Sequence, residues 1–124
     1  MTATRSVYAS FAAGTLAVLT LAACGGPAYE PGSPEALYVE LGCAKCHGNA
    51  REGLRSGPAL DNLQDRWQEE RLVAYFRSPK AMMKAEPRLA YMAEQYPIAM
   101  PGFPDTDEAA LRTLARHILT DSGD

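Results

Sequence analysis

The chain has 124 residues, a formal net charge of −3 at pH 7 and a hydrophobic fraction of 47%, which leaves room for one small domain at most. This weakly acidic balance offers no long-range attraction to a polyanion, so we exclude nucleic-acid binding driven by counterion release. The apolar and charged fractions are ordinary for a globular domain, and they also exclude the collagen-like and wholly disordered classes.

The N-terminus has the pattern of an export signal. Arg5 is followed by an uncharged apolar run at 11–23, which is too short to span a bilayer of about 30 Å as a helix. The run ends in Leu21-Ala22-Ala23-Cys24, which resembles a bacterial lipobox, where the cysteine is acylated and becomes the new N-terminus. We therefore expect a lipoprotein signal peptide over 1–23 and a lipidated Cys24. An uncleaved anchor with an incidental cysteine is the alternative.

The next segment, 24–33, is rich in glycine and proline, which predicts a flexible tether in front of a folded domain at 34–124. Gly25 differs from the aspartate that retains lipoproteins in the inner membrane of some Gram-negative bacteria, so the outer membrane is the default. We expect an exported protein that is lipid-anchored to a bacterial membrane and faces the periplasm or the cell exterior. Ser33 and Pro34 then read as the N-cap and first residue of a short helix.

That helix leads to Cys43-Ala44-Lys45-Cys46-His47, the C-x-x-C-H spacing at which c-type haem is attached. At this spacing each thiol can form a thioether with one vinyl group on the same porphyrin edge, and the imidazole of His47 falls beneath the iron. A dithiol redox pair or half of a zinc site are the alternatives, and both need partners that the sequence lacks. We expect one haem c, covalently bound through Cys43 and Cys46.

Three further helices are predicted after the motif. The first covers about 68–77 and ends at Ser78-Pro79, the second covers about 87–95, and the last is amphipathic and begins at a cap provided by Asp105 or Thr106. Prolines at 97, 101 and 104 exclude regular structure before the last helix. No stretch alternates as a strand does. The prediction is an all-α fold with three to five short helices.

These helices supply too few apolar side chains to enclose a core by themselves, because domains of this size bury a modest fraction of their surface. We expect the haem to complete the core. The candidate core residues are Leu37, Leu41, Leu60, Leu63, Trp67, Leu72, Phe76, Leu111, Leu114 and Ile118.

The order of features over about 35–119 resembles the class I c-type cytochromes: a short helix, CAKCH, a Gly57-Pro58 turn, a middle helix, Met100-Pro101 in a loop and an amphipathic last helix. The resemblance implies a small monohaem cytochrome fold with His47 as proximal and Met100 as distal iron ligand. It also implies that a carbonyl near Pro58 accepts the second N–H of His47, and that the first and last helices cross near Gly42. Trp67 either donates its indole N–H to a haem propionate or packs in the core.

Other residues have competing interpretations. Met82, Met83 and Met92 are alternative distal ligands, in a segment (80–95) that is longer than in the smallest class I cytochromes, although methionines of this kind more often fill gaps in packing. His117 is expected to be a surface or partly buried histidine, not a ligand. Six basic residues either ring the exposed haem edge as a docking patch or are simply solvated: Lys45, Arg51, Arg55, Lys80, Lys84 and Arg88.

The function implied by the resemblance is that of an electron carrier, not an enzyme. An iron with both axial positions filled by histidine and methionine leaves no open site for a small-molecule substrate, and the methionine raises its reduction potential relative to two histidines. The expected partners are redox proteins outside the cytoplasm, together with the membrane that holds the lipid. Two alternatives stay open: a cytochrome subunit of a larger oxidoreductase, and a haem-based sensor whose methionine is displaced.

Overall fold

The computed structural model describes residues 25–26 and 28–120. The predicted signal peptide (1–23), the predicted lipidation site Cys24 and the last four residues of the predicted domain (121–124) lie outside the described residues. Within the described part, none of the helices combines the length and the apolarity that crossing a membrane requires.

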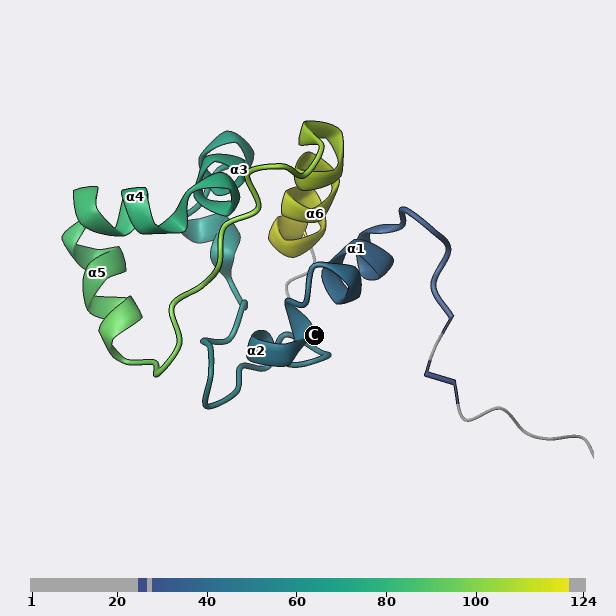
Figure 1. Cartoon of the computed structure of the whole chain (residues 1–124), viewed down its shortest axis with the longest axis horizontal. Helices are drawn as coiled ribbons and strands as arrows, with labels where there is room; N and C mark the ends of the chain where they lie inside the picture. Colours follow the sequence, from purple (N-terminus) through teal and green to yellow (C-terminus); the bar gives the residue numbers. More distant parts are fainter. Residues whose placement is uncertain (1–24, 27, 121–124) are drawn as a thin grey trace, which may run out of the picture.

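The described residues form helices and connecting loops, with a single antiparallel bridge between Leu54 and Gly57, so the predicted all-α fold is confirmed (Figure 1). In chain order the elements are α1 (Pro34–Glu40), α2 (Ala44–His47), the 3₁₀ turn η1 (Leu63–Asp65), α3 (Glu69–Arg77), α4 (Pro79–Ala85), α5 (Pro87–Glu94) and α6 (Glu108–Thr120). These are six α-helices, one more than the upper bound of our prediction.

The helix that the sequence analysis missed is α4. Ser78 and Pro79 end α3 as predicted, but Pro79 is also the first residue of α4. A proline at the first helical position loses no hydrogen bond, because its missing N–H has no partner inside the helix. The same pair of residues therefore separates two helices instead of closing one.

The cap of α6 was also assigned to the wrong residue. Neither Asp105 nor Thr106 caps this helix: the side chain of Asp107 accepts a hydrogen bond from the Ala110 N–H (3.1 Å), and its carbonyl accepts from the Leu111 N–H (3.0 Å). This is the N-cap arrangement, in which a short acidic side chain satisfies a backbone donor of the first turn. At the other end of the domain, Ser33 caps α1 as predicted by accepting from the Ala36 N–H (3.1 Å).

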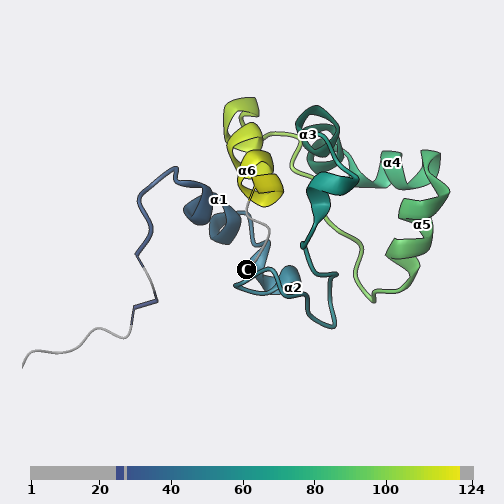
Figure 2. The same cartoon turned by 180° about the vertical axis from the view of Figure 1, so that it is seen from behind.

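The core lies where α6 packs against α1 and α3. Leu111 and Leu114 of α6 are fully buried, as expected for the apolar face of an amphipathic helix. Helices α4 and α5 pack mainly on each other, and both views show this pair on the opposite side of the domain from α1 (Figures 1 and 2).

Most of the predicted core residues occupy the core. Six are buried: Trp67, Leu72, Phe76, Leu111, Leu114 and Ile118. Leu41, Leu60 and Leu63 are partly buried and pack against this cluster, and Leu37 is partly buried. We predicted that these side chains are too few to fill the interior of the domain. In agreement with this, a cavity lies between α2, α3, α5 and the segment before α6.

Candidate functional site

The C-x-x-C-H motif forms a tight turn of helix directly after α1. Gly42 adopts a φ of +77°, a left-handed conformation that favours glycine, and the chain then turns into α2, where the His47 N–H donates to the Cys43 carbonyl (2.9 Å). This left-handed turn explains the glycine at position 42, near which the resemblance placed the crossing of the first and last helices. A Cβ there would meet only the side chain of Lys45, at 3.7 Å or more, so the backbone turn accounts for the glycine and a close crossing of α1 with α6 does not.

The two cysteines of the motif are not joined in a disulfide. Cys43 is buried and Cys46 is partly buried. Burial raises the pKa of the Cys43 thiol to about 11, because an apolar environment disfavours the thiolate. The surroundings of Cys43 therefore disfavour a charged side chain at this position of the cavity wall.

The chain after His47 folds back over the motif. The Gly53 N–H donates to the His47 carbonyl (2.8 Å) and the Leu60 N–H donates to the Arg51 carbonyl (2.9 Å). In this arrangement His47 Nδ1 lies 2.7 Å from the carbonyl oxygen of Pro58, which can only accept, so Nδ1 carries the proton. The contact expected near Pro58 is present, and Nε2 is the imidazole nitrogen left to bind a metal.

A cavity of about 210 Å³ begins at this motif. Cys43, Cys46 and His47 line it, and so does Met100 from the segment before α6. Its remaining lining is mainly apolar and comes from α3, α5 and the loops around them: Leu60, Leu63, Leu72, Phe76, Leu89, Ile98 and Phe103 among others.

The three methionines considered as alternative distal ligands differ in whether they line this cavity. Met83 of α4 and Met92 of α5 line the same cavity as Met100. Met82 is not among the lining residues and packs against the hydrophobic core. The predicted proximal and distal ligands thus line one cavity, together with two of the three alternative distal ligands, Met83 and Met92.

One part of the cavity wall is polar and cationic. Arg66 and Arg88 line it next to Trp67 and Tyr75. Trp67 is only 8% exposed; its ring centroid lies 5.2 Å from that of Tyr75, and the guanidinium of Arg71 lies 4.6 Å from the Trp67 ring. Trp67 therefore packs in the core, which is one of the two roles considered for it. Because Trp67 also lines the cavity, a hydrogen bond from its indole N–H to a haem propionate stays a prediction.

His117 lies away from this cavity, as expected for a residue that is not a ligand. It lines a separate polar cavity with Glu35 and Arg51, and its Nδ1 lies 4.0 Å from a Glu35 carboxylate oxygen. The Arg51 side chain donates to the His117 carbonyl (3.3 Å). Arg51, one of the six basic residues of the proposed docking patch, therefore turns towards α6.

Two contacts that support the motif were not predicted from the sequence, although Gly57 itself was noted as part of the Gly57-Pro58 turn. The Tyr38 hydroxyl donates to the Gly48 carbonyl (2.8 Å), which ties α1 to the loop after His47, and burial raises the pKa of Tyr38. A Cβ at Gly57 would lie 2.8 Å from the Cys46 carbonyl oxygen, so only glycine lets this segment pass so close to the motif. Neither contact has a local sequence signal, because each joins residues about ten positions apart.

The chemistry of the cavity fits a c-type haem. Cys43, Cys46 and His47 lie on the wall at the spacing of the motif, Met100 lines the same space, and the rest of the lining is largely apolar and includes two arginines, Arg66 and Arg88. Imidazole nitrogen and methionine sulfur are the axial pair of His/Met cytochromes. The Cys43 and Cys46 sulfurs would hold such a group, and His47 and Met100 would ligate its iron.

An all-α domain that presents C-x-x-C-H to an apolar cavity has the architecture of a c-type cytochrome. The family model described as "Cytochrome c" matches residues 34–122, and the chain belongs to this family. No curated protein and no solved structure matches the chain. Membership of the family implies covalently bound haem c and haem-based electron transfer.

Proposed function

We propose that this protein is a membrane-tethered, monohaem cytochrome of class I that carries single electrons between redox partners outside the cytoplasm, with His47 and Met100 as the axial ligands of its iron. The observation that carries the proposal is the shared cavity: Cys43, Cys46, His47 and Met100 reach one largely apolar space from two separate segments of the chain. Lipid on Cys24 and the tether at 24–33 would keep the domain at the membrane surface.

The residues of the site have distinct roles in this proposal. A bound haem supplies an iron that cycles between the ferric and ferrous states. His47 binds through Nε2, and its Nδ1–H bond to Pro58 fixes the orientation of the ring and makes the ligating nitrogen more basic. Met100 supplies a sulfur that favours the reduced iron and raises the potential. With both axial positions filled, no position stays open to oxygen or peroxide.

The proposal is tested by a redox titration of the purified holoprotein, followed in its visible spectrum. We expect one single-electron transition, a c-type pyridine haemochrome, and haem that acidified organic solvent does not extract. Extraction of free haem from the intact chain would contradict covalent attachment. The control is Cys46→Ala, which removes one thioether and shifts the haemochrome band towards that of haem with one free vinyl group.

One observation favours a second candidate, a haem-based sensor with a displaceable methionine. Met83 and Met92 line the same cavity as Met100, so the segment 80–95 forms part of the wall around the distal side. Carbon monoxide distinguishes the two functions. A carrier keeps its reduced spectrum when the gas is added, whereas a sensor shows a new spectrum at concentrations that leave the fold intact.

A further inference from the structure

The backbone that follows Met100 lies against the C-terminal end of α3. The Phe103 N–H donates to the Phe76 carbonyl (2.8 Å), and a Cβ at Gly102 would lie 2.9 Å from the Arg77 carbonyl oxygen. Figure 1 shows this segment leaving α5, passing the end of α3 and continuing into α6. The position of Met100 therefore depends on a contact between its loop and α3.

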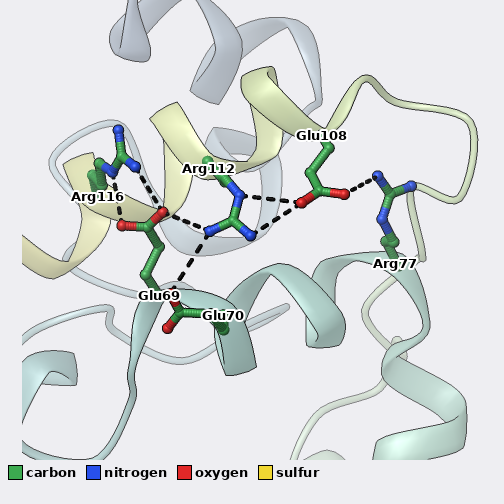
Figure 3. Close-up of polar contacts among 6 residues, drawn as sticks. All are labelled: Glu69, Glu70, Arg77, Glu108, Arg112 and Arg116. Atoms are coloured by element: carbon green, nitrogen blue, oxygen red, sulfur yellow. Dashed lines mark hydrogen bonds and ion pairs between the residues drawn. The ribbon is translucent and has the colours of Figure 1, made fainter.

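Arg77 makes two further contacts at this place. Its Nη1 donates to the Pro104 carbonyl (3.0 Å), and its Nη2 lies 3.8 Å from an Oε2 of Glu108, in the first turn of α6. Figure 3 shows Arg77 at one end of a row of charged side chains on α3 and α6. A single guanidinium thus joins α3, the loop after Met100 and the start of α6.

At the other end of this row, the arginines of α6 bind glutamates of α3 and α6. Arg112 bridges Glu108 and Glu69 with bonds of 3.0 Å, and Arg116 binds Glu69 at 2.7 Å (Figure 3). Arg116 and Arg77 both belong to this row of ion pairs between α3 and α6, but Arg77 also donates to the Pro104 carbonyl in the loop, whereas the Arg116 guanidinium binds Glu69. Arg116 therefore provides a control of matched chemistry.

We propose that Arg77 is a positioning residue for Met100: by binding the Pro104 carbonyl and Glu108 at once, it holds the loop closed so that the thioether stays at the iron. The proposal rests on the His47/Met100 ligation put forward above. An arginine suits this role because its fork of N–H groups reaches two separate acceptors, whereas a lysine ammonium is a single compact charge. Loss of one net hydrogen bond would raise the population of the open loop about fivefold.

The test is the affinity of the ferric holoprotein for cyanide, which binds only when Met100 leaves the iron. Because the apparent affinity scales with the open population, we expect Arg77→Gln to raise it about fivefold and Arg116→Gln to leave it unchanged. Gly102→Ala should act in the same direction as Arg77→Gln, because its Cβ would press on the backbone of Arg77 without removing a charge. Arg77→Lys should give a smaller rise.

Denaturant unfolding of the same samples separates positioning from general stability. A merely structural role would shift the unfolding midpoint of Arg77→Gln and leave the cyanide affinity under native conditions at the Arg116→Gln value, which would overturn the proposal. Equal affinities for Gly102→Ala and the wild type would overturn it as well, even if Arg77→Gln yields no holoprotein.

A different result would reject the proposed ligation of the iron by His47 and Met100. If the oxidised wild type lacks the near-infrared sulfur-to-iron band, or if Met100→Ala keeps it, then Met100 is not the ligand and the proposed His/Met assignment is wrong. If Met100→Ala loses the band and Arg77→Gln binds cyanide as Arg116→Gln does, the ligation stands and only the role of Arg77 is rejected.

Discussion

Gly57 lies directly against the backbone of Cys46: a Cβ atom on Gly57 would come within 2.8 Å of the Cys46 carbonyl oxygen and 3.2 Å of the Cys46 Cβ. The next residue, Pro58, is the one whose carbonyl accepts from His47 Nδ1 at 2.7 Å. The close approach at Gly57 therefore sets the position of the acceptor that orients the imidazole. A residue without a side chain is needed here to build the proximal side of the site.

We expect Gly57→Ala to raise the reduction potential of the holoprotein and to lower its free energy of unfolding by about 1–3 kcal/mol, the usual cost of overpacking. The added methyl group pushes the Pro58 carbonyl away from His47, which weakens the hydrogen bond and makes the ligating nitrogen less basic. A less basic ligand stabilises the ferric iron less. A redox titration and denaturant unfolding measure the two effects.

Two neighbouring substitutions are controls for this prediction. Ser56→Ala removes a bond to the Lys45 carbonyl (3.3 Å) without touching the acceptor of His47, and Pro58→Ala keeps the accepting carbonyl. Both should leave the potential close to that of the wild type. If Gly57→Ala shares their potential, the position of the Pro58 carbonyl does not tune the imidazole.

The second prediction concerns the distal ligand. Met100→Ala should abolish the near-infrared sulfur-to-iron band, lower the reduction potential and open the iron to carbon monoxide. Met82→Ala is the matched control, because Met82 packs against the core but does not line the cavity. Should the band survive in Met100→Ala and disappear in Met83→Ala or Met92→Ala, the ligand is one of those residues and α4 or α5 carries it.

Much of the helical structure could be predicted because it depends on local signals. The Ser33 cap, the proline at the start of α1 and the apolar face of α6 are each encoded within a few residues. Helix α4 was missed because Pro79 was read only as a terminator, although a proline is equally compatible with a first turn. Asp107 was missed as the cap of α6 because several adjacent acidic or hydroxyl residues satisfy the same pattern.

The site was predicted in part because C-x-x-C-H is a contiguous motif and because the resemblance supplied Pro58 and Met100. What could not be predicted is the set of contacts between distant segments. The sequence has no local pattern that pairs Tyr38 with Gly48, or Arg77 with Pro104. These pairs follow from how α1, α3 and the loops pack, so they become visible only in three dimensions.

The third prediction concerns the membrane anchor. Cys24→Ser, with the rest of the signal intact, should remove labelling by a radioactive fatty acid and either block processing or release the domain into the soluble fraction. A single acyl chain binds membranes only marginally, so stable anchoring requires the two or three chains that lipoprotein processing adds. Gly26→Ser is the control and should remain lipidated. Soluble mature wild-type protein with a free amino terminus near Pro27 would contradict the lipobox assignment.

The fourth prediction concerns the basic residues on α4 and α5. Lys80, Lys84 and Arg88 are exposed, and Arg88 also lines the cavity. If they form the docking surface, electron transfer to an anionic oxidant such as ferricyanide should slow as salt rises, because charges are screened beyond a Debye length of about 8 Å at physiological ionic strength. Replacing all three with Gln should slow the reaction at low salt and flatten this dependence.

Lys45 and Arg55, which are exposed on α2 and the loop after it, provide the comparison for that experiment. A flattened salt dependence in Lys45→Gln/Arg55→Gln, with no change in the α4 and α5 variant, would move the docking surface to the side of the C-x-x-C-H motif. A rate that does not depend on ionic strength in any variant would instead indicate an apolar docking face.

The last prediction follows from Glu69, which links α3 to α6. Hydrogen bonds from Arg116 and then from Arg112 lower the pKa of Glu69 from its ordinary value of 4.5. Between this lowered pKa and 4.5 the unfolded chain binds more protons than the folded one, so stability rises with pH across that window. The contribution of Glu69 is complete above pH 4.5 and is lost as the pH falls through the folded pKa. We therefore expect Glu69→Gln to be less stable than the wild type near neutral pH, with a shallower loss of stability in acid.

Unfolding of the holoprotein by denaturant at a series of pH values measures this difference. Glu70→Gln is the matched control: Glu70 is the next residue of α3, its side chain is 75% exposed, and its nearest oxygen lies 3.8 Å from Arg112, so its ion pair is solvated and contributes little. The two variants should therefore diverge near neutral pH and converge in acid, where the Glu69 carboxylate is protonated and its bonds to Arg116 and Arg112 lose their charge. Equal free energies of unfolding for both variants across the whole range would show that the ion pairs between α3 and α6 do not contribute to stability. Apolar packing around Leu111 and Leu114 would then be what holds the two helices together.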